Sequence, residues 1–416
     1  MGRVRGGSGS GTEADTRFAR ALREASGVAA LSPSSHNCQP WGVGHVTGRA
    51  GRDAVAAALG PEPGEAGDRW LALALDRSRE LTALPAHALE MEVSCGAYWY
   101  VLLRALRAQG WDCVRGGAVT GRHRTALPAA AGDAWPRAWL PLAVAALRPS
   151  GREPAAASGA AGRASALAEL RAVARARRTN RGAYRPEGIT PQGWEALDRT
   201  RPWAAERPFA GAADVRVRHL RTPAERERLA ALVARYAGRD FSHRRAWRET
   251  HGYLRWSAAD ARAGGDGLPV TQLFGPLSAP GLLRKRLALA PSAMRLLRWT
   301  GYPGRLAAGL ATLVRDAPAA VVMSLAGGSG GPEGPEGPGT EAALHGGARL
   351  ADYWFRATRA GLALHPVSVV LQHDDARREL AEAFGIEGRA FFLSRIGYPA
   401  CAFPPTPRRV AAHRSV

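Results

Sequence analysis

Lysine, cysteine and long apolar runs are scarce in this chain of 416 residues. Lys285 is its one lysine, although Lys and Arg together number 57 and the net charge is +21. The positive charge therefore comes from arginines spread along the whole sequence, which is typical of biased residue usage rather than of one basic patch. Arginine also binds phosphate well, because its planar fork donates to two oxygens at once. We accordingly expect an anionic small ligand and no nucleic-acid partner.

The few cysteines exclude a disulfide framework and a zinc site. They form no C-x-x-C pair and have no histidine partner at zinc spacing, so we interpret them as buried thiols and expect no metal. No stretch approaches the ~18 consecutive apolar residues of a spanning helix. The N-terminus also lacks the apolar core of a signal peptide. We therefore expect a cytoplasmic protein without a membrane partner.

Two successive segments each combine long helices with several strands, which predicts an α+β fold built from two halves. In the first segment we expect helices over 12–30 and 86–109 and strands at 43–46, 70–75 and 138–147. In the second we expect helices over 165–177 and 341–360 and strands at 215–220, 318–325 and 390–399. The predicted organisation is a disordered lead-in at 1–12, a first half at 13–147, a linker at 148–164, and a second half at 165–410 with an insertion or lid at 240–312 and a Gly/Pro loop at 327–340.

One short run, SPSSHNCQPWGV at 32–43, is rich in hydrogen-bonding side chains. Ser34 and Ser35 do not lie in a G-x-S-x-G elbow, which argues against a nucleophile. Together with Asn37 and Gln39 they offer donors and acceptors that suit the edge of a flat heterocycle. The alternative is a loop that bonds its own backbone, and local chemistry does not separate the two.

A second group, Arg177, Arg178, Thr179 and Arg181, lies at the expected end of a helix. Several guanidiniums and a hydroxyl within five residues could grip a phosphate dianion. The alternative is a solvated basic helix end that the helix dipole favours. Arg408 and Arg409 near the C-terminus leave the same two readings open.

The combination of motifs resembles the nitroreductase superfamily. SPSSHNCQPW resembles its flavin-contacting segment, and RRTNR followed by GITPQGWEAL resembles its opening Arg-Arg-Ser-x-Arg motif. RIGYP with the later PRR resembles its closing strand and its phosphate-contacting basic end. The order of these motifs, with LDRSREL and SCGAYWYVLLRALRAQGW, is similar to the Acg-type branch, in which one chain holds two fused half-sites. The resemblance covers about 15–147, 165–235 and 315–410.

This resemblance implies a nitroreductase-like fold: an intrachain pseudo-dimer of two half-domains, each with a small mixed sheet and packed helices. It implies one non-covalent FMN between the halves, with NAD(P)H as a possible co-substrate. The residues carried over to the cofactor are Pro33, Ser34, Ser35, Asn37 and Gln39 for the ring and ribityl chain, Arg177, Arg178, Thr179, Arg181, Arg408 and Arg409 for the phosphate, and Pro366, Val367 and Ser368 for the N5 edge.

Three functions remain open at this level. The first is reduction of a small or peptide-derived metabolite by NAD(P)H, with hydride exchange at flavin N5. The second is an oxidase or dehydrogenase that uses O2, and the third is a protein that sequesters FMN under a lid. His36, His365 and Tyr398 are weak candidates for a proton donor. We expect a monomer or a loose homodimer.

Overall fold

The computed structural model describes residues 9–60, 64–65, 67–150, 160–198, 208–209, 214–326, 339–410 and 413–416. Most of the expected lead-in, linker and Gly/Pro loop therefore lies outside the described residues. Within the described part of the chain, no helix is both long and apolar enough to cross a membrane.

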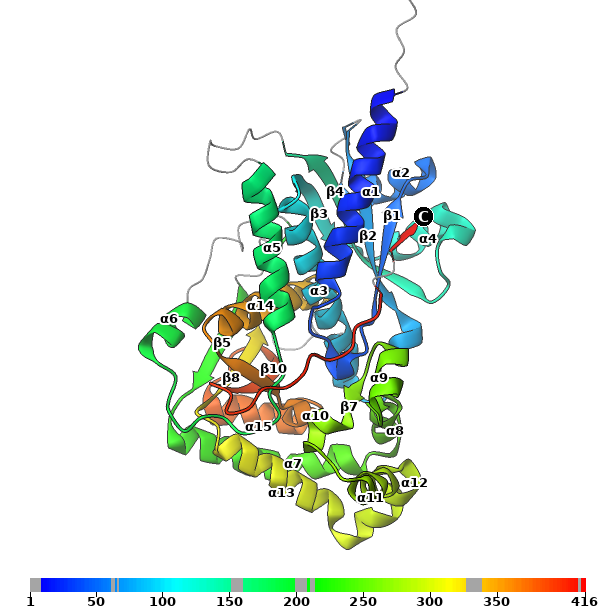
Figure 1. Cartoon of the computed structure of the whole chain (residues 1–416). Helices are drawn as coiled ribbons and strands as arrows, with labels where there is room; N and C mark the ends of the chain where they lie inside the picture. Colours follow the sequence, from blue (N-terminus) through cyan, green and yellow to red (C-terminus); the bar gives the residue numbers. More distant parts are fainter. Residues whose placement is uncertain are drawn as a thin grey trace, which may run out of the picture.

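The first half is a five-stranded sheet with helices packed against it (Figure 1). Its strand order is β11-β1-β2-β4-β3, and all neighbours are antiparallel except the parallel pair of β1 and β11. Its elements are α1 (Gly9–Ala29), β1 (Trp41–Val46), α2 (Arg49–Leu59), β2 (Arg69–Asp76), α3 (Pro85–Arg107), β3 (Trp111–Ala118), α4 (His123–Ala131), β4 (Trp139–Pro149) and β11 (His413–Ser415). The helical spacing of Phe18, Leu22, Ala25 and Val28 buries one face of α1 in this core.

The second half is a four-stranded antiparallel sheet in the order β5-β8-β10-β9. Its elements are α5 (Ala160–Ala176), α6 (Pro191–Asp198), β5 (Val215–Leu220), α7 (Pro223–Ser242), β8 (Ala319–Leu325), α14 (Thr340–Arg359), β9 (Ala363–Pro366), α15 (Asp374–Phe384) and β10 (Arg389–Gly397). At the β9 edge of this sheet, Thr179 pairs with Leu364 in an isolated parallel bridge. The prediction of an α+β fold with two sheet-bearing halves is confirmed.

The segment at 240–312, which we expected to be an insertion or lid, is a series of short helices. It contains α8 (Arg244–Gly252), β6 (Leu254–Arg255), α9 (Ala258–Gly264), β7 (Leu268–Pro269), α10 (Val270–Phe274), α11 (Ala279–Leu289), α12 (Pro291–Leu297) and most of α13 (Tyr302–Arg315). The helix α13 packs on α7, and α11 and α12 form the lower end of the molecule (Figure 1).

The two halves meet where the central helices α3 and α14 cross. A glycine on each helix permits the close approach. A Cβ added to Gly96 would lie 2.4 Å from the Leu344 carbonyl oxygen, and one added to Gly347 would lie 2.1 Å from the Val93 carbonyl oxygen. Both distances are too short for a side chain, so only glycine fits the crossing.

The C-terminal segment returns from the second half to the first sheet. After β10 the chain runs back across the molecule and ends in β11, where His413 pairs with Val43 (Figure 1). Val416 extends this pairing by one hydrogen bond, because its amide donates to the His45 carbonyl. The sequence analysis did not foresee this strand, and the returning segment passes the candidate site described next.

Candidate functional site

A cavity of about 240 Å³ lies between the two halves. The loop before β1 and the start of α3 line it from the first half. The end of α5, α14, β10 and the loop after β9 line it from the second half. The segment at 240–312 and the returning C-terminal segment complete it. Of the sequence-predicted cofactor residues, the cavity lining includes Pro33, Ser34, Ser35, Asn37, Arg177, Arg178, Thr179, Arg181, Pro366, Ser368 and Arg408.

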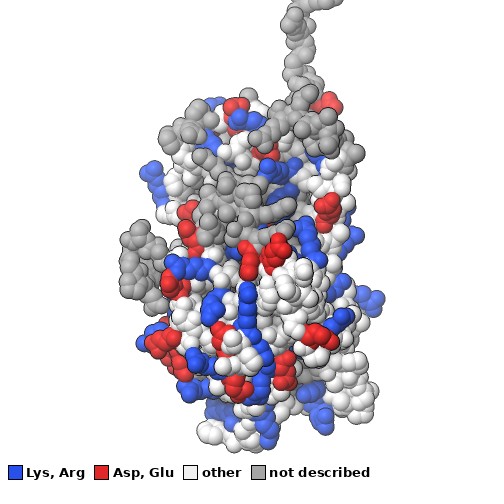
Figure 2. Space-filling model, turned by 90° about the vertical axis from the view of Figure 1, so that its left-hand side faces the viewer, with Lys and Arg blue, Asp and Glu red and all other residues white. Residues whose placement is uncertain are grey.

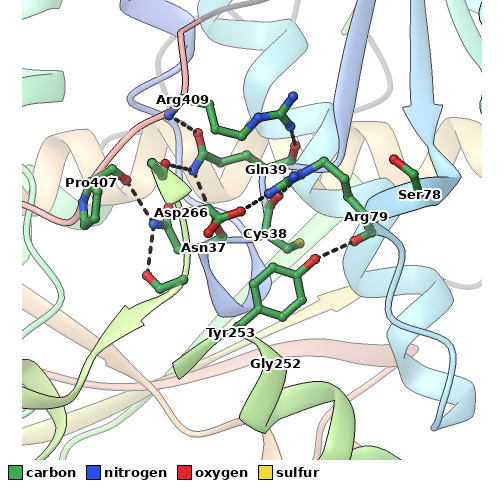
Figure 3. Close-up of polar contacts among 12 residues, drawn as sticks. Asn37, Cys38, Gln39, Ser78, Arg79, Gly252, Tyr253, Asp266, Pro407 and Arg409 are labelled. Carbon is green, nitrogen blue, oxygen red and sulfur yellow. Dashed lines mark hydrogen bonds and ion pairs between the residues drawn. The ribbon is translucent and has the colours of Figure 1, made fainter. Parts of the chain in front are cut away.

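The loop before β1 has a strained backbone. His36, Asn37 and Gln39 adopt φ of 50°, 52° and 52°, a left-handed conformation that costs free energy in residues other than glycine. Contacts with distant segments compensate for it (Figure 3). The Arg79 Nε donates to the Cys38 carbonyl at 2.6 Å, and Arg79 also forms an ion pair with Asp266. Such over-determined strain is typical of functional loops.

The amides of Asn37 and Gln39 are occupied by the protein itself. Asn37 Nδ2 donates to the carbonyls of Gly267 and Pro407 at 3.1 and 3.0 Å, and its Oδ1 accepts from Arg408. Gln39 Nε2 donates to the Gly265 carbonyl at 2.9 Å, and its Oε1 accepts from the Arg409 amide at 3.0 Å (Figure 3). The self-bonding reading therefore holds for the two amides, which fix the loop, while Ser34 and Ser35 line the cavity and their contact with a ligand stays a prediction.

Arginines gather at one end of the cavity. Where α5 ends, Thr179 bridges Leu364 of β9, so the segment after α5 lies along the edge of the second sheet. Arg177 is buried, stacks 4.7 Å from the Trp354 ring centroid and donates to the Leu31 carbonyl at 3.2 Å. The returning C-terminal segment adds Arg408 from the other direction. One basic part of the cavity is thus built from residues more than 200 positions apart.

The charges around these arginines are positive. Burial lowers the pKa of Arg177 well below its usual range, and the guanidiniums of Arg408 and Arg178 lower it further. Burial lowers the pKa of Arg181 to about 10, with a contribution from Arg395. Buried Nε of Arg177 and Nη1 of Arg181 have no hydrogen-bond partner among the described residues. Unpaired buried cations are costly, so this arrangement calls for an anion.

Other parts of the cavity lining are apolar. They are formed by Val93 of α3, Leu350 and Trp354 of α14, and Phe391 and Phe392 of β10. Sequence analysis missed these residues as site members, because a cavity wall and a core position carry the same apolar signal. The basic end and the apolar walls together suit a flat aromatic ligand with an anionic tail.

A carboxylate, Glu90, also faces the cavity and was missed. Its Oε2 accepts from Ser35 Oγ at 2.6 Å, and its Oε1 accepts from Gln372 Nε2 at 2.6 Å. Ser94, one turn further along α3, donates from Oγ to the Glu90 carbonyl and accepts from the Ser35 amide. The available signal was the spacing of four residues between Glu90 and Ser94 in the mainly apolar first half of the helix, where His87 and Glu92 also lie.

His36 lines the cavity with both ring nitrogens engaged. Nδ1 lies 3.1 Å from Ser35 Oγ, and Nε2 lies 3.1 Å from Thr250 Oγ1. Because Ser35 donates its proton to Glu90, it accepts from His36 Nδ1–H, which leaves Nε2 as an acceptor. Burial, His87 and Arg181 lower the pKa of His36 to about 3, so the ring is neutral near pH 7.

Five predicted residues lie outside the lining. Gln39 and Arg409 bond each other, as described above. Val367 is buried and donates its amide to the Leu393 carbonyl at 2.8 Å. His365 is buried and accepts from Arg395 Nε at 2.8 Å, and Tyr398 OH contacts Thr190 Oγ1 at 3.1 Å. Of the three proposed proton donors, only His36 reaches the cavity.

The structure defines an α+β protein with a cavity between its two sheet-bearing halves. Known proteins were compared with this chain by sequence and by structure. No family model matches the chain. Over 94% of its length the chain is 29% identical to the probable NAD(P)H nitroreductase PigM of a Serratia species, and the match covers 92% of that protein. This similarity over nearly the whole length supports a relationship to the nitroreductase family.

Two solved structures are also similar. One is the FMN-dependent nitroreductase NfnB from Mycobacterium smegmatis in complex with NADPH, with 16% identity and a TM-score of 0.32 over 56% of this chain and 88% of that chain. The other, from Anabaena variabilis and described provisionally as a nitroreductase, has 11% identity and a TM-score of 0.49 over 89% of this chain and 82% of that one. Both TM-scores lie below 0.5, so the sequence similarity to PigM carries the comparison.

Proposed function

We propose that this chain is an FMN-dependent oxidoreductase of the nitroreductase family, of the fused two-half type, that acts on a small or peptide-derived metabolite. The observation that carries the proposal is the presence of Arg177, Arg178, Arg181 and Arg408 in the lining of a cavity that also has aromatic and aliphatic walls. The guanidiniums of Arg177 and Arg181 line the cavity, and guanidiniums donate well to the acceptor oxygens of a phosphate. The whole-length similarity to PigM supports NAD(P)H as the electron donor.

Each group of lining residues fits one part of FMN. Arg177, Arg181 and Arg408 would hold the phosphate, and Trp354 with its apolar neighbours would contact the ring. Ser34 Oγ accepts from the Gln39 amide at 3.1 Å, so its own proton can be donated toward the ligand. Bound FMN supplies the hydride transfer, and the protein supplies orientation and electrostatics.

The loop after β9 offers fewer donors than the family resemblance implies. Val367 already donates its amide to Leu393, which leaves Ser368 as the loop residue that faces the cavity and can donate to the cofactor edge. A donor at that edge would stabilise negative charge on the reduced cofactor.

Proton transfer to or from the substrate is best assigned to Glu90. Its carboxylate accepts from Ser35 and Gln372, one donor on each oxygen, so it is held in place at the cavity wall. A positioned carboxylate can take a proton from a hydroxyl or return one to a product. Neutral His36 fits a different role, because its Nδ1–H orients the Ser35 hydroxyl that bonds Glu90.

The test begins with the purified full-length protein and its cofactor. We expect FMN absorbance, rapid bleaching by NADPH under anaerobic conditions and recovery of colour on addition of a nitro or quinone acceptor. Bleaching by dithionite but not by NADPH would instead support an oxidase or an FMN store. A protein that neither contains nor takes up FMN would contradict the proposal as a whole.

A matched pair of variants tests the phosphate end. Arg177→Ala should release FMN on dialysis, because it removes a buried guanidinium from the cluster. Arg175→Ala removes an exposed arginine from the end of the same helix and should retain FMN. Equal retention in both variants would show that the phosphate lies elsewhere.

A further inference from the structure

Within the segment at 240–312, residues 283–299 include several large apolar side chains that are exposed to solvent. Leu283 and Leu287 on α11 are 58% and 62% exposed, and Leu296 and Trp299 beside them are 68% and 79% exposed. These four are among the five most exposed large apolar residues in the described part of the chain. Grouped apolar exposure of this kind marks an interaction surface. We call these four residues and the helices that carry them the tip.

The tip is basic without any acidic residue. From Gly267 to Arg315 the sequence contains no Asp or Glu. The helices of the tip itself carry five basic residues, Arg284, Lys285, Arg286, Arg295 and Arg298. This differs from the face seen in Figure 2, where acidic side chains lie among the basic ones.

Apolar and basic side chains interleave on the tip. Leu283 and Leu287 are one helical turn apart and share a face of α11, next to exposed Arg284 and Arg286. Exposed Arg298 stacks 4.7 Å from the ring centroid of Trp299. Leucine and tryptophan flanked by arginine are typical of helices that lie in a membrane interface.

We propose that the tip binds the surface of an anionic lipid bilayer. The leucines and Trp299 would enter the boundary between headgroups and acyl chains, while the arginines contact lipid phosphates. This contact needs no spanning helix, so it revises the sequence-based expectation of no membrane partner. It places the cavity, to which the same segment contributes Leu268 and Gln272, near a source of apolar substrates.

Two other occupants fit the tip less well. A second copy docked through the same patch would bring like charges together, since the tip carries no acid to pair with them. A nucleic acid would match the charge but would offer no apolar surface to the three exposed leucines.

Co-sedimentation of the full-length protein with vesicles tests the proposal. We expect binding to vesicles of phosphatidylcholine mixed with phosphatidylglycerol, weak binding to phosphatidylcholine alone, and release as salt is raised. Each arginine near an anionic surface contributes about a fivefold change in partition, so Arg284→Gln with Arg298→Gln should weaken binding roughly 25-fold. Leu287→Gln with Trp299→Gln leaves the charge unchanged and should weaken binding at least tenfold, roughly, by removing two apolar anchors.

A control pair changes the charge elsewhere. Arg52→Gln with Arg137→Gln removes two exposed arginines from the first half and should bind as the wild type does. All six positions are exposed, and circular dichroism checks that each variant is folded. The proposal would be overturned if the protein failed to sediment with anionic vesicles at low salt. It would also be overturned if the control pair lost binding equally. Two further results would contradict it: a dimer that the Leu287 and Trp299 changes convert to a monomer, or binding of single-stranded DNA in place of vesicles.

Discussion

Replacement of Arg181 by methionine should move protein stability and cofactor affinity in opposite directions. In the protein without FMN, burial and Arg395 lower the pKa of Arg181 from 12.5 to about 10. Each pKa unit corresponds to about 1.4 kcal/mol, so the charged side chain opposes folding by at most about 3 kcal/mol. Methionine keeps the volume without the charge. We therefore expect the free energy of unfolding of the apoprotein to rise by about 1–3 kcal/mol.

The same change should weaken FMN binding. Arg181 lines the cavity, and its guanidinium would donate to the phosphate there. A hydrogen bond to a charged group contributes about 1.5–3 kcal/mol, so the dissociation constant should rise roughly 10- to 150-fold. No such loss is expected for Arg175→Met, which replaces an exposed arginine at the end of α5.

Two measurements decide the matter. Urea unfolding of the apoproteins gives the stability change, and titration of apoprotein with FMN, followed by fluorescence quenching, gives the affinity. Arg175→Met should change both by no more than about 0.5 kcal/mol. Two results would refute this reasoning. The Arg181→Met apoprotein could be less stable than the wild-type apoprotein, or it could bind FMN as tightly as the wild type does. Either result would mean that Arg181 is not an uncompensated cation that an anion stabilises.

Two further changes test the helix crossing and the strained loop. Gly347→Ala puts a Cβ 2.1 Å from the Val93 carbonyl oxygen and should lower the free energy of unfolding by about 1–3 kcal/mol. The control Gly309→Ala has open space around the new Cβ and should raise stability slightly. Equal melting temperatures of the two variants would contradict the close crossing of α3 and α14. His36 has a folded pKa of about 3, below its unfolded value of 6.5, so the unfolded state binds its proton first and stability is lost as pH falls from about 6.5 toward 3. His36→Asn keeps a residue that tolerates positive φ, and the pH dependence of urea unfolding in that window should then become shallower by about 1.4 kcal/mol per pH unit. An unchanged slope would mean that His36 is not buried in its neutral form.

Much of the fold was predictable because its signals are local. The helix start at Thr222 is one case: the sequence predicts an N-cap, a first-turn proline and a capping-box glutamate, and the structure shows Thr222 and Glu225 in that reciprocal arrangement. The predicted strand at 215–220 is found as Val215–Leu220. Short elements were harder. The strand β11 is the tripeptide at 413–415, and only its pairing with β1 makes it a strand.

The segment at 240–312 shows a second limit. Its helices α9, α10 and α12 have only five to seven residues, too few for a clear apolar period. Caps such as Ser257 and Ser278 mark the starts of α9 and α11, but each is a weak signal without a periodic helix behind it. The exposed leucines there also look like core positions in sequence, and only the structure shows that nothing among the described residues covers them.

Asn37 and Gln39 show why the roles of site residues could not be separated from sequence. Their amide groups have the same chemistry whether they bond a ligand or the protein. The partners that decide the matter are carbonyls and an amide at 265–267 and 407–409, some 230 and 370 positions away. The partners at 407–409 reach the loop as the C-terminal segment returns to the first sheet, where β11 pairs with β1. The returning C-terminal segment therefore has two effects: it brings Arg408 into the cavity lining, and it supplies partners to the amides of Asn37 and Gln39.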